Sequence, residues 1–299
     1  MIIVDYSGIA LASIIINKTF DEGMIRHMIL NSLRMYRTKF KDDYGELVIA
    51  VDGANNWRRK AFPQYKAGRK KDRDKSSFDW GEAFRILHMV KDEIKENFPY
   101  KVIHIDGCEA DDIIGTIVTM NPDPNRDYNH EKIMIVSSDR DFLQLQKYKF
   151  VRQYSPLLKK ELVENNPRLY LQTHIIKGDK GDGVPNILSD DNTFVEGFRQ
   201  TPMSKKKIDN IIQDLDEGEL LYAASWYRNY CRNKKLIDLT ETPEDLRKEI
   251  FSSRQNRKRK LELEKITNPE AAAAKRLKKN TRKRVARKRK MDELKRGGF

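Results

Sequence analysis

The sequence predicts an α/β fold, in which a parallel sheet flanked by helices is followed by a smaller helical subdomain and a basic, partly helical tail. Over the first half of the chain, short apolar runs alternate with segments of helical periodicity, which is typical of a parallel sheet. Beyond residue 254 the composition changes to a dense run of Lys and Arg. These two observations fix the order of the parts.

The apolar runs at residues 1–4, 47–51, 101–105 and 132–136 have the length of strands, and 149–154 is a candidate fifth. Helical spacing of apolar residues predicts helices around 25–36 and 84–98, and Asp79 followed by Glu82 indicates where the second of these begins. After about Ser155 we expect no further strand. The predicted parts are therefore a catalytic domain at 1–154, a helical subdomain at 155–253 and a tail at 254–299.

The net charge of +14 lies in the tail. Residues 254–299 hold 19 of the 59 basic and 5 of the 45 acidic residues, so the preceding part is neutral. A cationic segment of this kind binds phosphate backbones through counterion release, although a solvated tail that aids solubility is an alternative. A helix start at Asn268-Pro269-Glu270 and a stop at Gly297-Gly298 predict a long basic helix within it.

Composition excludes several classes of protein. No run of about 18 apolar residues and no secretory leader pattern is present, so we expect no membrane contact and a cytoplasmic location. Cys108 and Cys231 cannot form a disulfide framework, and the five histidines include no close metal-binding pair. Any metal is therefore expected to be held by oxygen ligands.

Acidic residues follow the predicted strands one after another. Because the carboxyl ends of parallel strands meet at one edge of a sheet, these side chains should converge. A further pair lies in the glycine-rich segment 178–183. The full set is Asp5, Asp52, Glu109, Asp111, Asp112, Asp139, Asp141, Asp179 and Asp182.

So many carboxylates repel one another unless cations compensate them, and oxygen ligands alone favour Mg²⁺, with Mn²⁺ as its substitute. Two such ions can activate a water and stabilise the leaving oxygen of a phosphodiester. Each acid taken singly is also explained as a helix cap or a turn residue. Acids after four successive strands are much harder to explain in that way.

A basic segment at 57–75 leaves the sheet directly beside Asp52, so it is placed to overhang the acids. Its cations can hold a phosphate and its aromatic residues Trp57, Phe62 and Tyr65 can stack on a base, while a solvated loop is the alternative. With the lysines of the helical subdomain, the predicted nucleic-acid contacts are Arg58, Arg59, Tyr65, Lys70, Lys71, Lys177, Lys180, Lys205, Lys206 and Lys207.

Several of these segments, in the same order, resemble the 5′-nuclease family of flap endonucleases and 5′-3′ exonucleases, which has a PIN-like fold. The matching motifs are Val51-Asp52-Gly53, Tyr65-Lys66-Ala67-Gly68-Arg69, Glu109-Ala110-Asp111-Asp112, Ser137-Ser138-Asp139-Arg140-Asp141 and Gly178-Asp179-Lys180-Gly181-Asp182. The resemblance implies that Asp5, Asp52, Glu109, Asp111 and Asp112 serve the metal nearer the scissile phosphate. It implies that Asp139, Asp141, Asp179 and Asp182 serve the other metal, and that Lys66 and Arg69 are catalytic.

The resemblance further implies a magnesium-dependent nuclease and ribonuclease H that acts on DNA and RNA:DNA duplexes with a 5′ flap or nick. Its expected role is removal of RNA primers during phage replication, as a monomer in the host cytoplasm, with a sliding clamp and a single-strand-binding protein as partners. The family places a helix-turn-helix duplex-binding element with a potassium ion at 178–184. Here Val184-Pro185-Asn186-Ile187 replaces the usual hairpin, so the sequence does not establish the potassium ion.

The sequence departs from the family pattern in two places, and two rival functions stay open. The short distance from Lys71 to Asp79 predicts an open or disordered bridge, and the tail after Arg254 has no counterpart in the family pattern. The rival functions are a PIN-type ribonuclease acting on single-stranded RNA and a non-catalytic nucleic-acid-binding scaffold. Acids after every expected strand weigh against the scaffold, and the 178–183 segment weighs against the ribonuclease.

Overall fold

The computed structural model describes residues 1–120, 131–218 and 223–254, apart from the side chains of Lys70 and Lys71. Residues 1–251 form one compact unit. The predicted basic helix at 268–297 and all of the tail beyond residue 254 lie outside the described residues. Among the described residues, no helix is long and apolar enough to cross a membrane.

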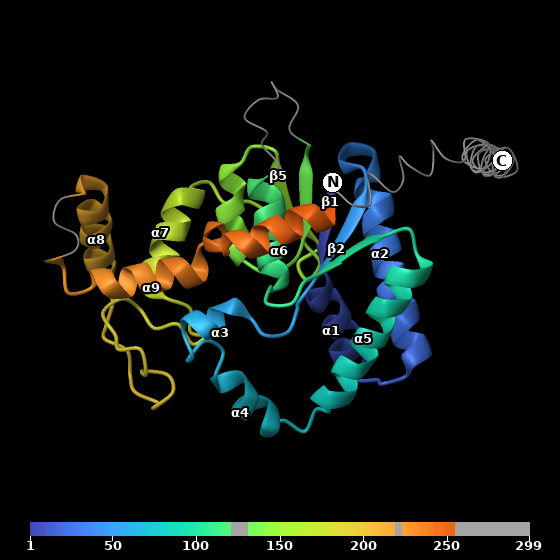
Figure 1. Ribbon diagram of the computed structural model, residues 1–299, viewed down its shortest axis with the longest axis horizontal. Coiled ribbons are helices and arrows are strands. Elements are labelled where there is room, and N and C mark those ends of the chain that lie inside the picture. Colours follow the sequence, from blue (N-terminus) through green and yellow to red (C-terminus); the bar gives the residue numbers. More distant parts are fainter. Residues whose placement is uncertain (121–130, 219–222, 255–299) are drawn as a thin grey trace, which may run out of the picture. The chain divides into compact units, whose positions relative to one another are not determined.

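A six-stranded sheet in the order β3-β2-β1-β4-β5-β6 forms the centre of this unit (Figure 1). The first five strands are parallel, as predicted, and lie within two residues of the predicted runs. They are β1 (Ile2–Asp5), β2 (Leu47–Val51), β3 (Lys101–His104), β4 (Ile133–Val136) and β5 (Val151–Ser155). The expectation of no strand after Ser155 is wrong, because β6 (Lys160–Leu162) pairs antiparallel to β5.

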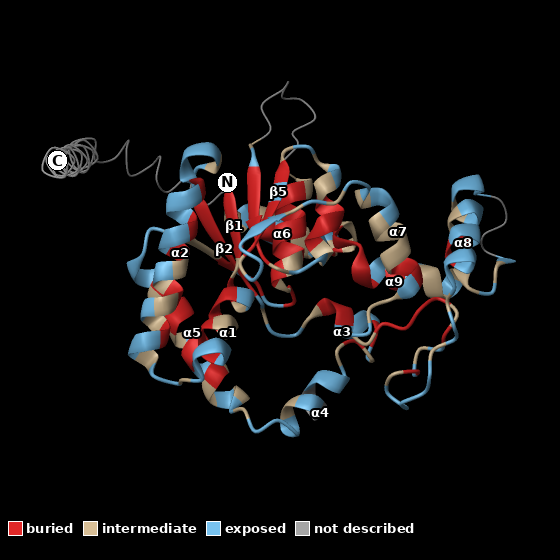
Figure 2. Ribbon diagram, turned by 180° about the vertical axis from the view of Figure 1, so that it is seen from behind, coloured by how far each residue is buried: buried red, intermediate tan, exposed pale blue. Residues whose placement is uncertain are grey.

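Helices cover both faces of the sheet, and the strands explain why. In β1, Ile2 and Val4 belong to one buried cluster and Ile3 to another, since successive side chains of a strand point to opposite faces. The first face packs against α1 (Tyr6–Asn17), α2 (Glu22–Tyr44) and α5 (Trp80–Asn97). The second packs against α6 (Ala110–Thr119), the 3₁₀ helices η1 (Asp141–Lys147) and η3 (Leu239–Glu241), and helical residues 244–251. The four central strands β1, β2, β4 and β5 are accordingly buried almost throughout, whereas the edge strands β3 and β6 are partly exposed (Figure 2).

The segment between β2 and α5 forms α3 (Trp57–Ala61) and α4 (Gly68–Asp74). The bridge, residues 66–79, contains α4 and is therefore not disordered. The predicted start of α5 is confirmed, because the Glu82 backbone N–H donates to the Asp79 carboxylate at 2.9 Å.

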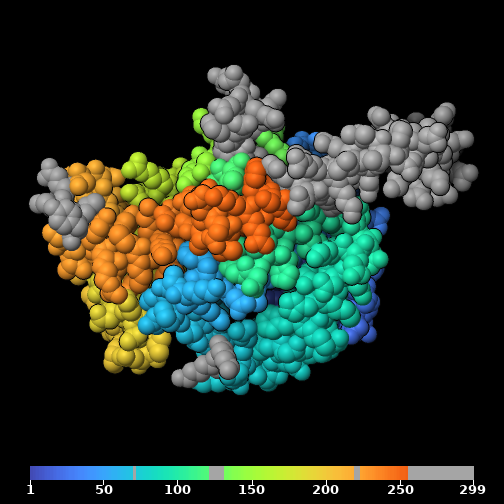
Figure 3. Space-filling view, in the orientation of Figure 1, coloured from blue at the N-terminus to red at the C-terminus, as the bar shows by residue number. Residues whose placement is uncertain are grey.

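The helical part comprises α7 (Pro167–Lys177), α8 (Lys205–Glu217) and α9 (Tyr227–Ile237). Residues 178–204 join α7 to α8, so these two helices are not linked by the tight turn of a helix-turn-helix. One buried cluster contains Phe62 and Tyr65 together with Ile175 of α7 and Leu236 of α9. Figure 3 shows residues 223–251 (orange) beside α3 and the segment that follows it (blue).

Candidate metal centre

The predicted acids do gather at the carboxyl edge of the sheet. Asp5 ends β1, and Asp52 directly follows β2. Gly53 follows because a Cβ there would lie 2.0 Å from the Ile105 carbonyl oxygen. Glu109 and Asp111 stand at the start of α6, and Asp139 precedes η1 after β4. The sheet topology therefore brings residues far apart in sequence to one edge.

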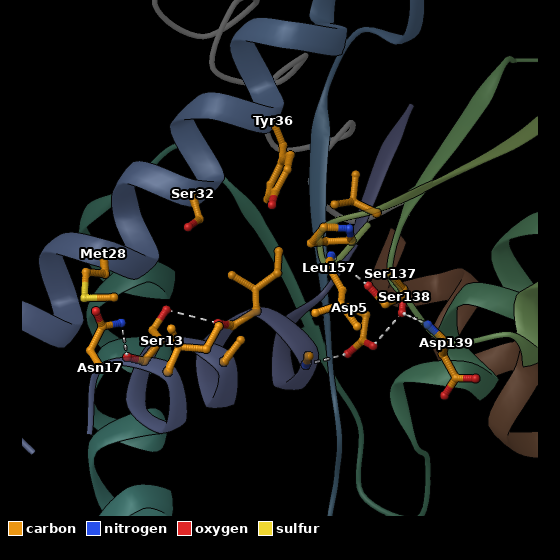
Figure 4. A pocket seen from close by; sticks show the side chains of 16 residues that line it. Asp5, Ser13, Asn17, Met28, Ser32, Tyr36, Ser137, Ser138, Asp139 and Leu157 are labelled. Atoms are coloured by element: carbon orange, nitrogen blue, oxygen red, sulfur yellow. Dashed lines mark hydrogen bonds between the residues drawn. The ribbon is translucent and has the colours of Figure 1, made fainter. Parts of the chain in front are cut away.

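Hydrogen bonds hold the first two carboxylates in place. Ser137 Oγ donates to Asp5 at 2.9 Å. Ser7 Oγ donates to Asp52 at 2.6 Å, and the Ala110 backbone N–H donates to the other Asp52 oxygen at 2.8 Å. Figure 4 shows Asp5, Ser137 and Asp139 together at one end of a cavity of about 530 Å³. The cavity runs between α1, α2 and the turn at Leu157, so the acids border an open space.

The centre of the site is a group of three aspartates. One oxygen each of Asp111, Asp139 and Asp141 lies within 4.8 Å of the others. Burial, and then the Asp139 charge, raise the pKa of Asp141 to about 7 and that of Asp111 well above its usual range. Burial and then Asp52 raise the pKa of Asp5 to about 6. Without a cation, these carboxyl groups resist ionisation.

A histidine joins the site on the side of α7, where the sequence had predicted none. His174 lies between Asp141 and Asp179, 3.5 Å and 3.4 Å from their oxygens, and these three residues form a second group of close ligand atoms. Its position five residues before Asp179, in the last turn of α7, which Gly178 caps, was the available signal. A search for paired histidines could not detect it, because its partners are carboxylates.

Lys66 and Arg69 reach the acids from the bridge. Lys66 Nζ lies 2.5 Å from Glu109 and 3.3 Å from Asp182, and Arg69 lies 2.6 Å from the second oxygen of Asp182. Burial lowers the pKa of Lys66, but Asp182 and Glu109 outweigh it, so the pKa is raised and the amine is charged. Burial likewise acts to raise the pKa of Glu109, but Lys66 and Arg58 hold it below its usual range.

The 178–184 loop is built to meet the bridge closely. Asp179 and Val184 exchange backbone hydrogen bonds of 2.8 and 2.7 Å. Gly183 has a φ of +73°, and a Cβ there would lie 3.0 Å from the Gln64 carbonyl oxygen. The Lys66 backbone N–H donates to the Asp182 carbonyl at 2.7 Å. This packing delivers the side chain of Asp182 to Lys66 and Arg69.

Burial contradicts two of the predicted nucleic-acid contacts, Arg58 and Tyr65. The Arg58 side chain is only 2% exposed and Tyr65 is 3% exposed. Arg58 pairs with Asp112 at 2.9 Å and donates to the Leu236 carbonyl, and the Tyr65 hydroxyl contacts Glu109 and Asp182 at 2.8 and 2.7 Å. Trp57 and Phe62 are buried as well, so the three aromatic residues expected to stack on a base are occupied within the protein.

Asp112 also differs from the other predicted ligands. It is fully buried, and both oxygens are taken by donors from Trp57, Thr242, Arg58 and the Glu109 backbone, at 2.8 to 3.1 Å. Four donors satisfy a carboxylate. Its geometry is that of an anchor for Arg58 behind the metal centre.

Replacing Arg58 should therefore make the folded protein less stable. We expect Arg58→Met to lower the free energy of unfolding by about 3 to 5 kcal/mol, because the buried Asp112 carboxylate loses its counter-charge. Urea denaturation in the presence of chelator measures this. Arg59→Met, on the exposed side of the same helix, should change it by less than about 0.5 kcal/mol, and Asp112→Asn in the Arg58→Met background should restore part of the loss. Equal effects of the two arginine variants would contradict the anchor.

The remaining predicted contacts are on the surface. Arg59 on α3, Lys177 and Lys180 around the end of α7, and the three lysines that begin α8 are exposed. A groove in the helical part is lined by Lys177, Lys180 and Arg199 together with Phe194 and Phe198. The side chains of Lys70 and Lys71 lie outside the description.

Comparison with known proteins identifies the family. The model of the 5′-3′ exonuclease N-terminal resolvase-like domain matches residues 5–173, and that of the T4 RNase H C-terminal domain matches residues 165–282. The chain belongs to the 5′-3′ exonuclease family. It is 35% identical over 262 residues to ribonuclease H of Enterobacteria phage T4, with 84% of each chain covered. It is 26% identical to a 5′-3′ exonuclease of Mycoplasmopsis pulmonis, with 70% of each covered.

Solved structures agree with this fold. The phage T5 5′-exonuclease with bound zinc has a TM-score of 0.60 at 15% identity, and the alignment covers 84% of this chain and 96% of that one. The T5 flap endonuclease in a complex with DNA and metal ions has a TM-score of 0.59 at 16% identity, covering 84% and 98%. These structures show the fold, while the family match and the 35% identity to T4 ribonuclease H show that the chain is a hydrolase of the 5′-3′ exonuclease and ribonuclease H type.

The family match also corrects one expectation about the tail. The C-terminal model extends to residue 282, so residues 254–282 do have a counterpart in a relative of this 5′-3′ exonuclease family. The sequence motifs of the metal centre end before residue 186, and the tail lacks motifs of that kind. Matching active-site motifs could therefore not show how far into the tail the similarity to the family extends.

Proposed function

We propose that this 5′-3′ exonuclease-family protein is a magnesium-dependent, structure-specific nuclease that removes RNA primers and adjacent DNA during phage replication. The observation that carries the proposal is the group of Asp111, Asp139 and Asp141 within 4.8 Å at the edge of the sheet. Acids held this closely in a protein are a costly arrangement that divalent cations relieve.

The side chains at this edge of the sheet offer the oxygen ligands that hard cations prefer. Carboxylate oxygens dominate, and burial, followed by a neighbouring carboxylate, raises the pKa of Asp5 and of Asp141. We assign one ion to Asp5, Asp52, Glu109 and Asp111, and a second to Asp139, Asp141, Asp179 and Asp182. When bound, two such ions supply an activated water and stabilise the leaving oxygen of a phosphodiester. Asp112 supports the first group as an anchor.

The chain's own cations have a separate role. Lys66 and Arg69 lie against Asp182 at the rim of the acids, where an entering scissile phosphate would meet them. With these acids occupied as ligands, Lys66 would be free of its pairs with Glu109 and Asp182. The freed amine and guanidinium then hold the phosphate and stabilise charge that develops on it. Cleavage leaves a 5′-phosphate and a 3′-hydroxyl.

Metal binding should release protons near pH 6.5. A raised pKa means that Asp5 and Asp141 keep protons up to about pH 6 and 7, and a cation must displace them. We expect about one proton released per protein at pH 6.5 and much less at pH 8.5, measured by calorimetry in two buffers of different ionisation enthalpy. The same shifts stabilise the metal-free fold below pH 4 and are lost as pH rises through 6 to 7. Absence of proton release at pH 6.5 would contradict these assignments.

The proposed substrates are DNA and RNA:DNA duplexes with a 5′ flap or nick, for which the DNA complex of the T5 flap endonuclease gives a structural precedent. The test is parallel digestion of a 5′-labelled flap, a nicked duplex, a single strand and an RNA:DNA hybrid, with Mg²⁺ and with chelator. We expect Mg²⁺-dependent cleavage of the flap and the hybrid. With RNA as the single strand, cleavage of that strand alone would support the PIN-type ribonuclease, and cleavage of none of the substrates would support the non-catalytic scaffold.

We further propose that the protein acts as a monomer in the cytoplasm of the infected host, with a sliding clamp and a single-strand-binding protein as partners. The three-part division at residues 154 and 253 is part of this proposal. A potassium ion is not included, because Val184-Pro185-Asn186-Ile187 replaces the hairpin that is usual in the family.

The tail should act through phosphate contacts. Residues 254–299 carry the whole net charge, so their deletion should weaken binding to all DNA sequences alike. The slope of log K against log salt should flatten by about 0.7 to 0.9 per lost contact, while cleavage at saturation survives. Truncation after Lys290 is the matched control, because it keeps 17 of the 19 basic residues and should preserve the slope. An unchanged slope after full deletion would support the solvated-tail alternative.

A further inference from the structure

His174 is the one nitrogen ligand among the groups of close ligand atoms found in the described residues. Its ring stands between two carboxylates, with Nδ1 3.5 Å from Asp141 Oδ1 and Nε2 3.4 Å from Asp179 Oδ2. The two nitrogens are therefore not equivalent. Each faces a different element, since Asp141 begins η1 and Asp179 follows α7.

Nδ1 is the unsatisfied atom of this ring. It is shielded from solvent and has no hydrogen-bond partner, whereas Nε2 is oriented by the hydrogen bond to Asp179. A carboxylate that binds one ring nitrogen fixes the tautomer and turns the lone pair of the other nitrogen toward a metal. A buried polar atom without a partner is otherwise costly.

The separation from Asp141 suits a shared ion. Ligand atoms at about 2.1 Å from a metal, at right angles to each other, lie about 3 Å apart. The 3.5 Å between Nδ1 and Asp141 Oδ1 is close to this spacing. Asp141 also belongs to the group of Asp111 and Asp139, so an ion at this place would lie inside the proposed centre.

We propose that Nδ1 of His174 is a ligand, together with Asp141, of the second ion of the proposed nuclease centre, and that Asp179 serves this ion by orienting the ring and not as a direct ligand. The position is then a mixed nitrogen and oxygen site. Imidazole suits first-row transition ions, of which Mn²⁺ is the weakest binder at sites with nitrogen ligands, whereas Mg²⁺ prefers oxygen ligands. The site should therefore prefer Mn²⁺ over Mg²⁺ more strongly than carboxylates alone would.

A different role for the same ring is a protonated counter-ion between the two aspartates. Asp141 and Asp179 lie on either side of the ring, Asp139 contributes further negative charge, and Tyr170 packs edge-on with ring centres 6.0 Å apart. The two roles make opposite demands on a replacement. A lysine preserves a cation but cannot coordinate a metal while it is charged, and a glutamine offers only a neutral amide.

The test compares His174→Gln and His174→Lys in the full-length protein, with His27→Gln on the exposed side of α2 as the matched control. Calorimetric titration with Mn²⁺ and with Mg²⁺, at pH 8, gives the ratio of the two affinities. We expect both His174 variants to lower that ratio by about tenfold or more, and His27→Gln to leave it unchanged. A wild-type ratio in His174→Lys would establish the counter-ion role and overturn the proposal.

Pulsed electron paramagnetic resonance supplies a readout that does not depend on affinity or activity. Wild-type protein loaded with Mn²⁺ should show coupling to a histidine nitrogen, which changes on ¹⁵N labelling of histidine and is absent in His174→Gln. Bound Mn²⁺ without such coupling would overturn the inference about His174 but leave the proposed function standing. Failure of both Mn²⁺ and Mg²⁺ to bind the wild type would overturn the proposed function on which it rests.

Discussion

Asp111→Asn should cleave a 5′-flap substrate in Mg²⁺ at least about a hundredfold more slowly than the wild type, which is the scale of losing one electrostatic group that acts in the transition state. Asn keeps the volume of Asp and remains compatible with the first turn of α6, but it cannot supply a charged ligand. Asp139→Asn should behave alike, since its amide oxygen can still accept the 2.9 Å hydrogen bond from the Asp141 backbone.

The stability of the same variants separates ligands from helix caps. Burial and neighbouring carboxylates raise the pKa of Asp111, so its ionised form is destabilised at pH 8. In chelator, Asp111→Asn should therefore unfold at an equal or higher temperature than the wild type. Asp43→Asn, on the exposed side of α2, is the matched control and should change neither rate nor stability. Near-normal cleavage by Asp111→Asn in Mg²⁺ would reject the ligand assignment.

Lys66→Ala should lower the single-turnover rate far more than it weakens substrate binding. Only interactions that are stronger in the transition state raise the rate, and the Lys66 amine lies at the acids rather than on the outer surface. Rapid-quench kinetics and equilibrium binding on one flap substrate measure the two effects.

Lys41→Ala, an exposed lysine in the last turn of α2, is the control for loss of positive charge and should alter neither quantity. Weaker binding with an unchanged rate at saturation would instead make the bridge a general clamp for nucleic acid.

Much of the fold follows from local patterns in the sequence. Five parallel strands could be predicted because each is a short apolar run, and α5 because Asp79 and Glu82 mark its start. The strand β6 could not, since Lys160–Leu162 is short and its burial pattern carries no alternation. Its pairing depends on the turn after β5, where Lys159 adopts a φ of +54°.

The convergence of the acids was predictable from strand ends, but the environment of each was not. Arg58 reads as a surface cation in a basic run, and only the fold shows Leu236 and Asp112 enclosing it. His174 reads as an isolated histidine until α7 brings it to Asp141. Such tertiary contacts join residues too distant in sequence for spacing to reveal.

The central claim is that the acids at the sheet edge hold the metal ions of the nuclease. Anomalous diffraction from crystals soaked in Mn²⁺ tests it most directly. We predict two peaks, one bordered by Asp5, Asp52 and Asp111 and the other by Asp141 and His174, and the loss of at least one in Asp111→Asn. Peaks confined to other surfaces, with none among these acids, would contradict the account.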